Sequence, residues 1–389
     1  MSGRRRPGGG KQGRGIRYAA FNVIELETEQ VQSPGDPQAE AAARVVQEVQ
    51  PDVLVVNELT NNTQEDEHTN RTNIDAFVEN YLSVPQRDDL DGIDYEHTLQ
   101  PESNTGVLPD QDYDFNKDGT AGERPGDAYG FGEYPGHYAF AIASNYPIDE
   151  SNLRSFQTFK WADMPGNLIP VAGEDGVVTD PEGDDLALYL TEEELDVYRL
   201  SSKTHIDVPF EVEGGTVHGL FAHPTPPGFD GVNNFNGKWN HDEVRFFADY
   251  VAGAEYIYDD SGVHGGLDDD ASYVLMGDMN AGPGLGRDER PLTPAQEFLI
   301  DNDDFDTDRL PKSPGGAQRG LPTATRVGGD VEGVVEQIDY VLPSPDLSLR
   351  ASSVVWPSEN ATKRNLGEDV SLASDHRLVW ADIATHPGH

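Results

Sequence analysis

The sequence contains no cysteine. Disulfide scaffolds, thiolate zinc sites and cysteine nucleophiles are therefore excluded together. No apolar run approaches the ~20 residues of a membrane-spanning helix, so we expect no membrane span. Lysine is scarce too, at seven positions among 389 residues. Acidic residues dominate instead: 71 Asp and Glu against 27 Lys and Arg give a net charge of −44.

The acidic surface limits the kinds of partner that we expect. A polyanion repels nucleic acid and anionic lipid, which disfavours passive adhesion to either. Such a surface repels itself at low salt and is tolerated where salt screens it. In this respect the composition resembles that of halophilic proteins from salt-loving archaea. Nothing in the sequence indicates a protein partner. Hydrophobic residues make up 36% of the chain, enough for a sizeable core.

The start of the chain, MSGRRRPGGGKQGRG, is basic and glycine-rich, and no apolar segment follows it. We interpret residues 1–15 as a disordered basic tail rather than a signal peptide. The expected location is cytoplasmic for the sequence as given, or extracellular if a signal segment has been removed. Residues 16–386 are expected to form one domain. Two stretches in it, a Gly/Asp-rich one near 101–134 and an acidic one near 165–198, are interpreted as inserted surface loops.

The order of apolar segments predicts an α/β fold. A strand is expected over 16–23, and Asp36 with Pro37 predicts a helix start. Pro51 ends that helix, and the apolar run at 52–57 is typical of a buried strand. Strand, helix and strand in so short a stretch form a β-α-β pattern. Further strands are expected at 138–144, 216–222, 273–277, 336–342 and 378–383, with helices over 241–256 and from Thr293.

Polar side chains follow several of these apolar runs, where the edge of a sheet would hold them rigidly beside open loops. They comprise carboxylates, carboxamides and imidazoles, with no evident serine or lysine nucleophile. Their oxygen atoms suit Mg²⁺, Mn²⁺ or Ca²⁺ rather than zinc. Histidines beside metal-binding carboxylates suit phosphoryl chemistry. The residues are Glu58 in VVNE, His223 in FAHPTPP, Asp278 and Asn280 in VLMGDMN, Asp339 in IDYVL, and Asp375 and His376 in SDHR.

In combination these motifs resemble the endonuclease/exonuclease/phosphatase superfamily. The segments FNV, NEL, HPTPP, GDMN, QIDYV and SDHR occur in the order typical of that family, over nearly the whole chain. The resemblance implies a four-layer α/β sandwich, with two mixed β-sheets face to face and helices outside. It also implies hydrolysis of a phosphate ester by in-line attack of water, with Mg²⁺ or Mn²⁺ as cofactor.

The resemblance further implies a role for each matching residue. Asn22, Glu58 and Asp375 are expected on the metal side. Asp278 is expected to polarise the attacking water, and Asn280 to bind a phosphate oxygen. Asp339 and His376 resemble the pair in which a carboxylate orients an imidazole against the phosphate. His223 resembles a histidine of nuclease-like and lipase-like members that either protonates the leaving group or steadies the phosphate. Lys203 and His205 in SSKTHIDVP are weaker candidates for phosphate binding.

The substrate is less defined than the chemistry. Because His223 is shared with nuclease-like members, we place a phosphodiester first, either nucleic acid or a small diester. A phosphomonoesterase acting on a small molecule or a lipid headgroup is the alternative, which the net charge of −44 favours. A non-catalytic binding protein on the same scaffold is the alternative of another class.

One further motif suggests a separate calcium site. DYDFNKDG places Asp112, Asp114, Asn116 and Asp118 at alternate positions before a glycine, which resembles the start of a calcium-binding loop. The match is partial. Counted from Asp114, the twelfth residue is Pro125 instead of glutamate, and counted from Asp112, the glycine position holds Lys117.

Overall fold

The computed structural model describes residues 15–64, 71–170, 189–229, 234–283, 292–328, 334–361 and 365–385. Within these residues the longer strands form two sheets. The first has the order β12 (Ser348–Val354), β13 (Val379–Ala384), β1 (Ile16–Leu26), β2 (Val53–Leu59), β4 (Phe140–Ser144) and β3 (His97–Leu99). The second has the order β11 (Asp339–Pro343), β8 (Ser272–Asp278), β7 (Gly215–Ala222), β6 (His205–Val212) and β5 (Arg154–Ser155).

Both sheets are mixed. Strand β1 runs parallel to β2 and antiparallel to β13, and β7 runs parallel to β8 while β8 is antiparallel to β11. Strands β9 (Arg326–Val327) and β10 (Val335–Glu336) form a separate two-stranded sheet. The predicted strands are confirmed, with boundaries that move by one to three residues.

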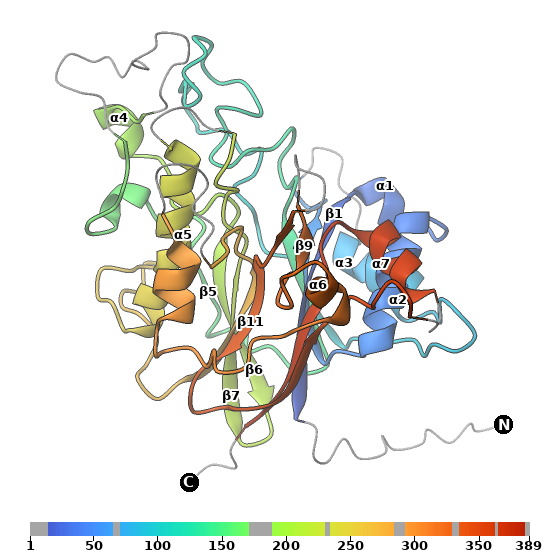
Figure 1. Ribbon diagram of the computed structural model, residues 1–389. Helices are drawn as coiled ribbons and strands as arrows, with labels where there is room; N and C mark the ends of the chain where they lie inside the picture. Colours follow the sequence, from blue (N-terminus) through green and yellow to red (C-terminus); the bar gives the residue numbers. More distant parts are fainter. Residues whose placement is uncertain are drawn as a thin grey trace.

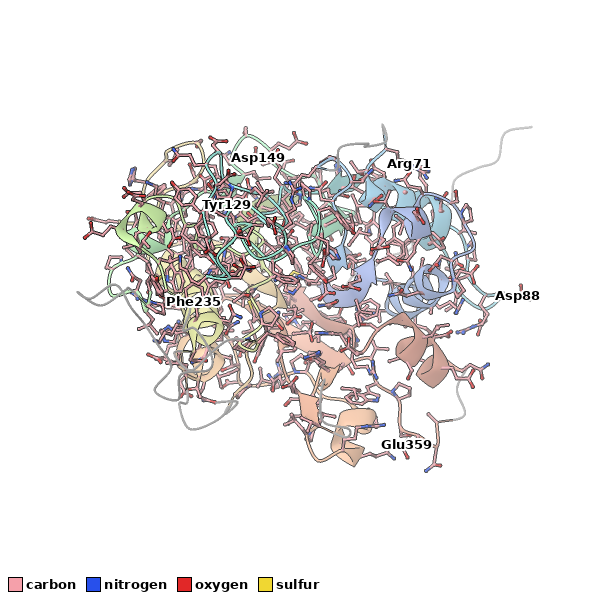
Figure 2. All side chains as sticks on the ribbon, turned by 90° about the horizontal axis from the view of Figure 1, so that it is seen from above. Arg71, Asp88, Tyr129, Asp149, Phe235 and Glu359 are labelled. Atoms are coloured by element: carbon pink, nitrogen blue, oxygen red, sulfur yellow. The ribbon has the colours of Figure 1, made fainter. Side chains whose placement is uncertain are left out.

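The longer helices α2, α5 and α7 lie on the outer faces of the sheets (Figure 1). The first sheet is covered by α1 (Thr28–Val31), α2 (Pro37–Val49), α3 (Asn73–Phe77), η1 (Val78–Leu82) and α7 (Leu366–Ala373). The second is covered mainly by α5 (Phe235–Val251) and η3 (Ala295–Ile300). Seen from above, Phe235 at the start of α5 and Arg71 just before α3 lie on opposite sides of the molecule (Figure 2). The remaining short helices are η2 (Trp161–Asp163), α4 (Glu192–Leu195) and α6 (Pro314–Gln318).

Strand periodicity explains this layering. Along β1, Tyr18 and Ala20 face the core between the sheets, whereas Ala19 and Phe21 pack against the helices. Because successive strand residues point to opposite faces and both faces are covered, the run is apolar throughout instead of alternating. The other central strands have the same arrangement. The predicted four-layer sandwich is confirmed.

Local sequence signals predict the start of α2 correctly but not the ends of α5. The predicted start at Asp36 is confirmed, since the Asp36 carboxylate accepts hydrogen bonds from the backbone of Gln38 and Ala39. The predicted helix over 241–256 is wrong at both ends: α5 begins at Phe235 and ends at Val251. Gly253 follows with a φ of 75°, a left-handed conformation that commonly ends helices.

The two predicted insertions differ in how much of each is described. Residues 101–134 lie between β3 and β4 and contain no helix or regular strand within the described chain. The 165–198 stretch contains α4, but its residues 171–188 lie outside the described residues. The predicted tail also lies outside them, apart from residue 15. No described helix is both long and apolar enough to cross a bilayer.

Candidate active site

The sheet topology brings the predicted residues to one edge of the molecule. Glu58 lies near the carboxyl end of β2, and Asp278 ends β8. Strand β11 runs antiparallel to β8, so its first residue, Asp339, lies directly opposite Asp278. His223 follows β7, and His376 precedes β13, which runs antiparallel to β1. Residues that are far apart in sequence therefore meet at one end of the sandwich, where strands of both sheets end.

Asn22 connects the two sheets at this edge. Its side-chain amide donates hydrogen bonds to Glu58 Oε1 at 2.9 Å and to Asp278 Oδ2 at 3.0 Å. The side-chain oxygen of Asn22, Oδ1, accepts a hydrogen bond from the backbone amide of Ile24 at 2.9 Å. Asn22 is fully buried. The amide nitrogen thus faces the two carboxylates and orients both of them.

Left-handed backbone is concentrated around these residues. Glu58 has a φ of 64° and Asn280 a φ of 48°, and Ile24 and Glu25 both lie near 50° where β1 bulges away from β2. The bulge lets the Glu25 amide donate to Glu58 Oε2 at 3.1 Å. Non-glycine residues with such angles are costly, and they occur most often at functional sites.

Gly277 permits the close packing beside Asp278. Its φ is 140°, and a Cβ there would lie 2.2 Å from the Ala222 carbonyl oxygen. A larger residue would push β7 and β8 apart next to His223. The glycine of GDMN therefore has a packing function at this position.

Asp339 and His376 form a buried pair. His376 Nδ1 donates to Asp339 Oδ2 at 2.9 Å, and Nε2 lies 3.8 Å from Asp278 Oδ2. Burial alone would lower the pKa of His376, but the Asp339 and Asp278 carboxylates raise it to about 10. The imidazole is therefore charged at neutral pH, with its Nε2 side toward Asp278.

The pKa of Asp278 is raised as well. Burial and the neighbouring Asp339 charge raise the pKa of Asp278 to about 7, against the opposing effects of His376 and Asn22. Asp278 Oδ1 accepts from the backbone of Asn280 at 2.8 Å, and the Asn280 side chain donates to the Pro224 carbonyl at 3.0 Å. Asn280 thereby links the loop after β8 to the loop that carries His223.

His223 lies between the carboxylates of both sheets. Its Nε2 is 3.6 Å from Asp278 Oδ2 and 4.0 Å from Glu58 Oε1. Burial, Lys203 and His376 together lower the pKa of His223 well below its ordinary value. The pKa values of the two histidines are therefore shifted in opposite directions, downward at His223 and upward at His376.

The arrangement fits a divalent cation. Glu58, His223 and Asp278 each offer a ligand atom, and these atoms lie within 4.8 Å of one another. A cation between the Glu58 and Asp278 carboxylates would offset their like negative charges. Carboxylates with an adjacent carboxamide suit Mg²⁺ or Mn²⁺. Glu58 and Asp278 are the residues that would hold it.

Asp375 has a different set of contacts from Glu58. Its Oδ2 accepts from Arg326 Nε at 3.1 Å, and its Oδ1 lies 3.8 Å from His376 Nε2. Oδ1 is buried and has no hydrogen-bond partner in the described chain. A metal-side role for Asp375 stays a prediction.

Lys203 and His205 are buried behind the site. His205 bonds Ser201 Oγ at 2.6 Å and the Glu243 carbonyl at 2.9 Å, and burial lowers its pKa to about 4. Both ring nitrogens are used internally, so His205 has no free donor for a phosphate. Lys203 Nζ donates to the Pro224 carbonyl at 3.4 Å, below the His223 loop. Neither residue lines the cleft described next.

A cleft of about 240 Å³ opens beside these residues. Glu58, Asp278, Asn280 and His376 line it, together with the loop 226–229. Arg326 also lines it, a residue that the sequence motifs did not indicate. No signal in TATRVGG marks this arginine, because its place depends on the β9–β10 hairpin.

The 112–118 loop is organised by its own hydrogen bonds. Asp114 Oδ2 accepts from the Gly119 backbone, and Asn116 and Asp118 bond each other. Lys117 reaches Glu194 at 2.6 Å. Within the described residues, Asp112, Asp114 and Asp118 do not form a cluster of three acidic ligands. Calcium binding at this loop stays a prediction.

Comparison with known proteins adds the family. The Endonuclease/Exonuclease/phosphatase family model matches residues 31–376. An endonuclease/exonuclease/phosphatase from Beutenbergia cavernae is 17% identical, with a TM-score of 0.51 over 96% of this chain and 72% of that one. Beta toxin from Staphylococcus aureus with bound magnesium ions is 15% identical, with a TM-score of 0.44 over 95% of this chain and 99% of that one. Sphingomyelinase C from Streptomyces griseocarneus is 13% identical, with a TM-score of 0.43 over 95% and 98%.

No curated protein matches the sequence. The family match covers most of the chain, and it includes every site residue named above except Asn22. The chain therefore belongs to the endonuclease/exonuclease/phosphatase family and is a metal-dependent hydrolase of phosphate esters.

Proposed function

We propose that the protein is a phosphodiesterase, and that Asn22, Glu58, Asp278, Asp339 and His376 form its active site. The observation that carries the proposal is the pair of hydrogen bonds that the Asn22 side chain donates, to Glu58 of the first sheet at 2.9 Å and to Asp278 of the second at 3.0 Å. This contact brings Glu58 to the same cleft as the Asp339–His376 pair. A divalent ion bound at Glu58 would offset the negative charge of the phosphate.

The proposed roles follow from position. Asp278, in the centre, accepts the proton of the attacking water as the new phosphorus–oxygen bond forms. The bond to the leaving group then breaks, and the leaving oxygen takes up a proton. His376, held by Asp339, and Asn280 bind phosphate oxygens in the transition state. His223 Nε2 either steadies the phosphate or, after taking up a proton from solvent, gives that proton to the leaving oxygen.

The test is hydrolysis of bis- and mono-p-nitrophenyl phosphate and plasmid DNA at high salt, with Mg²⁺ or Mn²⁺ and with EDTA. We expect turnover of the diester to exceed that of the monoester, to stop in EDTA and to return with the metal. Absence of turnover of all three substrates with every metal would contradict the proposal.

A phosphomonoesterase is the second candidate. The net charge of −44 favours it, because a nuclease gains affinity from a basic rim and this chain has few basic residues. The same assay separates the two: faster turnover of the monoester, with DNA left intact, would assign the monoesterase.

A further inference from the structure

Arg326 is fixed to the active site through its backbone. It begins β9 and pairs with Glu336 across the β9–β10 hairpin. On its other side it forms a β-bridge with His376, and the Val327 amide donates to the Asp375 carbonyl at 2.9 Å. The preceding residue, Thr325, accepts the Asp339 amide at its hydroxyl at 3.1 Å. The position of Arg326 is therefore set by the same segments that carry the Asp339–His376 pair.

Two carboxylates hold the Arg326 guanidinium in one orientation. Nε donates to Asp375 Oδ2 at 3.1 Å, and Nη1 donates to Glu336 Oε2 at 3.3 Å. The side chain remains 24% exposed. Nη2 makes no hydrogen bond to any described residue. A guanidinium anchored at two of its nitrogens keeps N–H donors for a third group, and it loses little conformational entropy when it binds one.

The acidic lining of the cleft indicates what the free N–H groups of Arg326 bind. Arg326 is the only lysine or arginine among the described residues that line it, whereas Glu58, Asp278 and Glu336 are all acidic. An anionic substrate entering such a cleft is repelled unless a cation meets it. Arginine is well suited to phosphate, because its planar N–H groups match the phosphate oxygens.

We propose that Arg326 binds a non-bridging phosphate oxygen of the substrate and that Asp375 and Glu336 act as positioning residues for its guanidinium. This inference rests on the proposed phosphoesterase function. Arg326 would then be a substrate-binding residue in addition to those in the sequence motifs. The inference also assigns Asp375 a role that its contact with Arg326 supports directly. The competing interpretation is that the two ion pairs only fasten the hairpin.

The experiment measures binding of inorganic phosphate to the Mn²⁺-loaded protein by calorimetry, together with kcat and KM for bis-p-nitrophenyl phosphate. Hydrogen bonds to a charged group contribute about 1.5–3 kcal/mol, so Arg326→Ala should weaken phosphate binding and raise KM by about 10–100-fold. Millimolar guanidinium chloride should restore part of the loss. Arg319→Ala is the matched control, because Arg319 is similarly exposed and pairs with Glu359 away from the cleft.

Glu336→Gln separates binding from hairpin stability. It removes one ion pair but keeps the guanidinium, so its loss of phosphate affinity should be clearly smaller than that of Arg326→Ala and unaffected by guanidinium. The proposal is overturned if Arg326→Ala binds phosphate like Arg319→Ala, or if Glu336→Gln loses as much affinity as Arg326→Ala. If the wild type binds phosphate through Arg326 but hydrolyses none of the esters, the proposed function fails and the binding assignment stands.

Discussion

The two corners of the active site hold charge in opposite ways. At the first, the Glu58 side chain is 18% exposed, and its oxygens accept hydrogen bonds from two neutral donors, the Asn22 side-chain amide and the Glu25 backbone amide. At the second, His376 is only 6% exposed and lies against the carboxylates of Asp339 and Asp278. The first corner leaves a negative charge open to the cleft, whereas the second encloses a positive charge. A metal ion is therefore expected at Glu58 and a phosphate oxygen at His376.

Asp278 belongs to both corners. Its Oδ2 accepts from Asn22 at 3.0 Å and lies 3.6 Å from His223 and 3.8 Å from His376. A residue that faces both the expected ion and the charged imidazole is suited to accept the proton of a water between them.

The largest effect is expected from Asp278→Asn. The substitution removes the proposed base while keeping the shape of the side chain, so kcat should fall by ~10³-fold. Steady-state kinetics on the diester measure this loss. Asp207→Asn is a matched control, since Asp207 is a buried aspartate of the second sheet that accepts from the Tyr250 hydroxyl. Equal losses in the two variants would indicate general damage to the sheet.

Asp339→Asn breaks the second corner alone. The imidazole loses the carboxylate that contributes most to its raised pKa, so its positive charge weakens where the phosphate would lie. Partners that orient a functional group typically contribute 10–100-fold, and kcat should fall by about that factor. Mn²⁺ affinity should change little. If Asp339→Asn lowered metal affinity more than kcat, the separation of the two corners would be wrong.

Glu58→Gln breaks the first corner. It removes one negative charge from the expected ion site, so Mn²⁺ affinity should fall by at least about 10-fold. Titration with Mn²⁺, followed by calorimetry and by activity, measures the change. Activity should recover in part at high Mn²⁺, because Asp278 and His223 still offer ligand atoms. Loss of activity with unchanged Mn²⁺ affinity would show that Glu58 does not bind the ion.

The smallest effect concerns stability in EDTA. The pKa of Asp278 is raised to about 7 in the folded protein, so between pH ~4 and ~7 the folded state binds a proton that the unfolded state releases. This residue therefore stabilises the fold less as pH rises through that window. The melting temperature of the wild type should fall more from pH 5 to pH 8 than that of Asp278→Asn, by a few degrees. Parallel pH profiles would show that Asp278 titrates normally.

Much of the fold and part of the site could be predicted from the sequence. Buried strands leave continuous apolar runs such as VLVV, and the polar residues at their ends mark the edge where the site lies. The helix start at Asp36 is equally local, because one side chain caps it. Such features depend on neighbours in sequence, so they can be identified without the tertiary structure.

The missed features depend on tertiary contacts. Arg326 lies on a strand of two residues, and only its pairing with Glu336 and His376 brings it to the cleft. His205 was a weak candidate for phosphate binding, but it lies at the start of β6 with its ring against Phe246 and Phe247 of α5. The motif SSKTHID does not reveal which way that ring points. His205 and His223 therefore differ in role because His205 faces α5 and His223 faces the carboxylates.

A crystal structure with Mn²⁺, located by its anomalous scattering, tests the central claim most directly. The claim is that Glu58 and Asp278, drawn together by Asn22, share one cation next to the Asp339–His376 pair. We expect the anomalous peak within bonding distance of both carboxylates, with Asn22 still between them. A peak confined to the 112–118 loop, or none at Glu58 under conditions in which the enzyme turns over, would contradict the account.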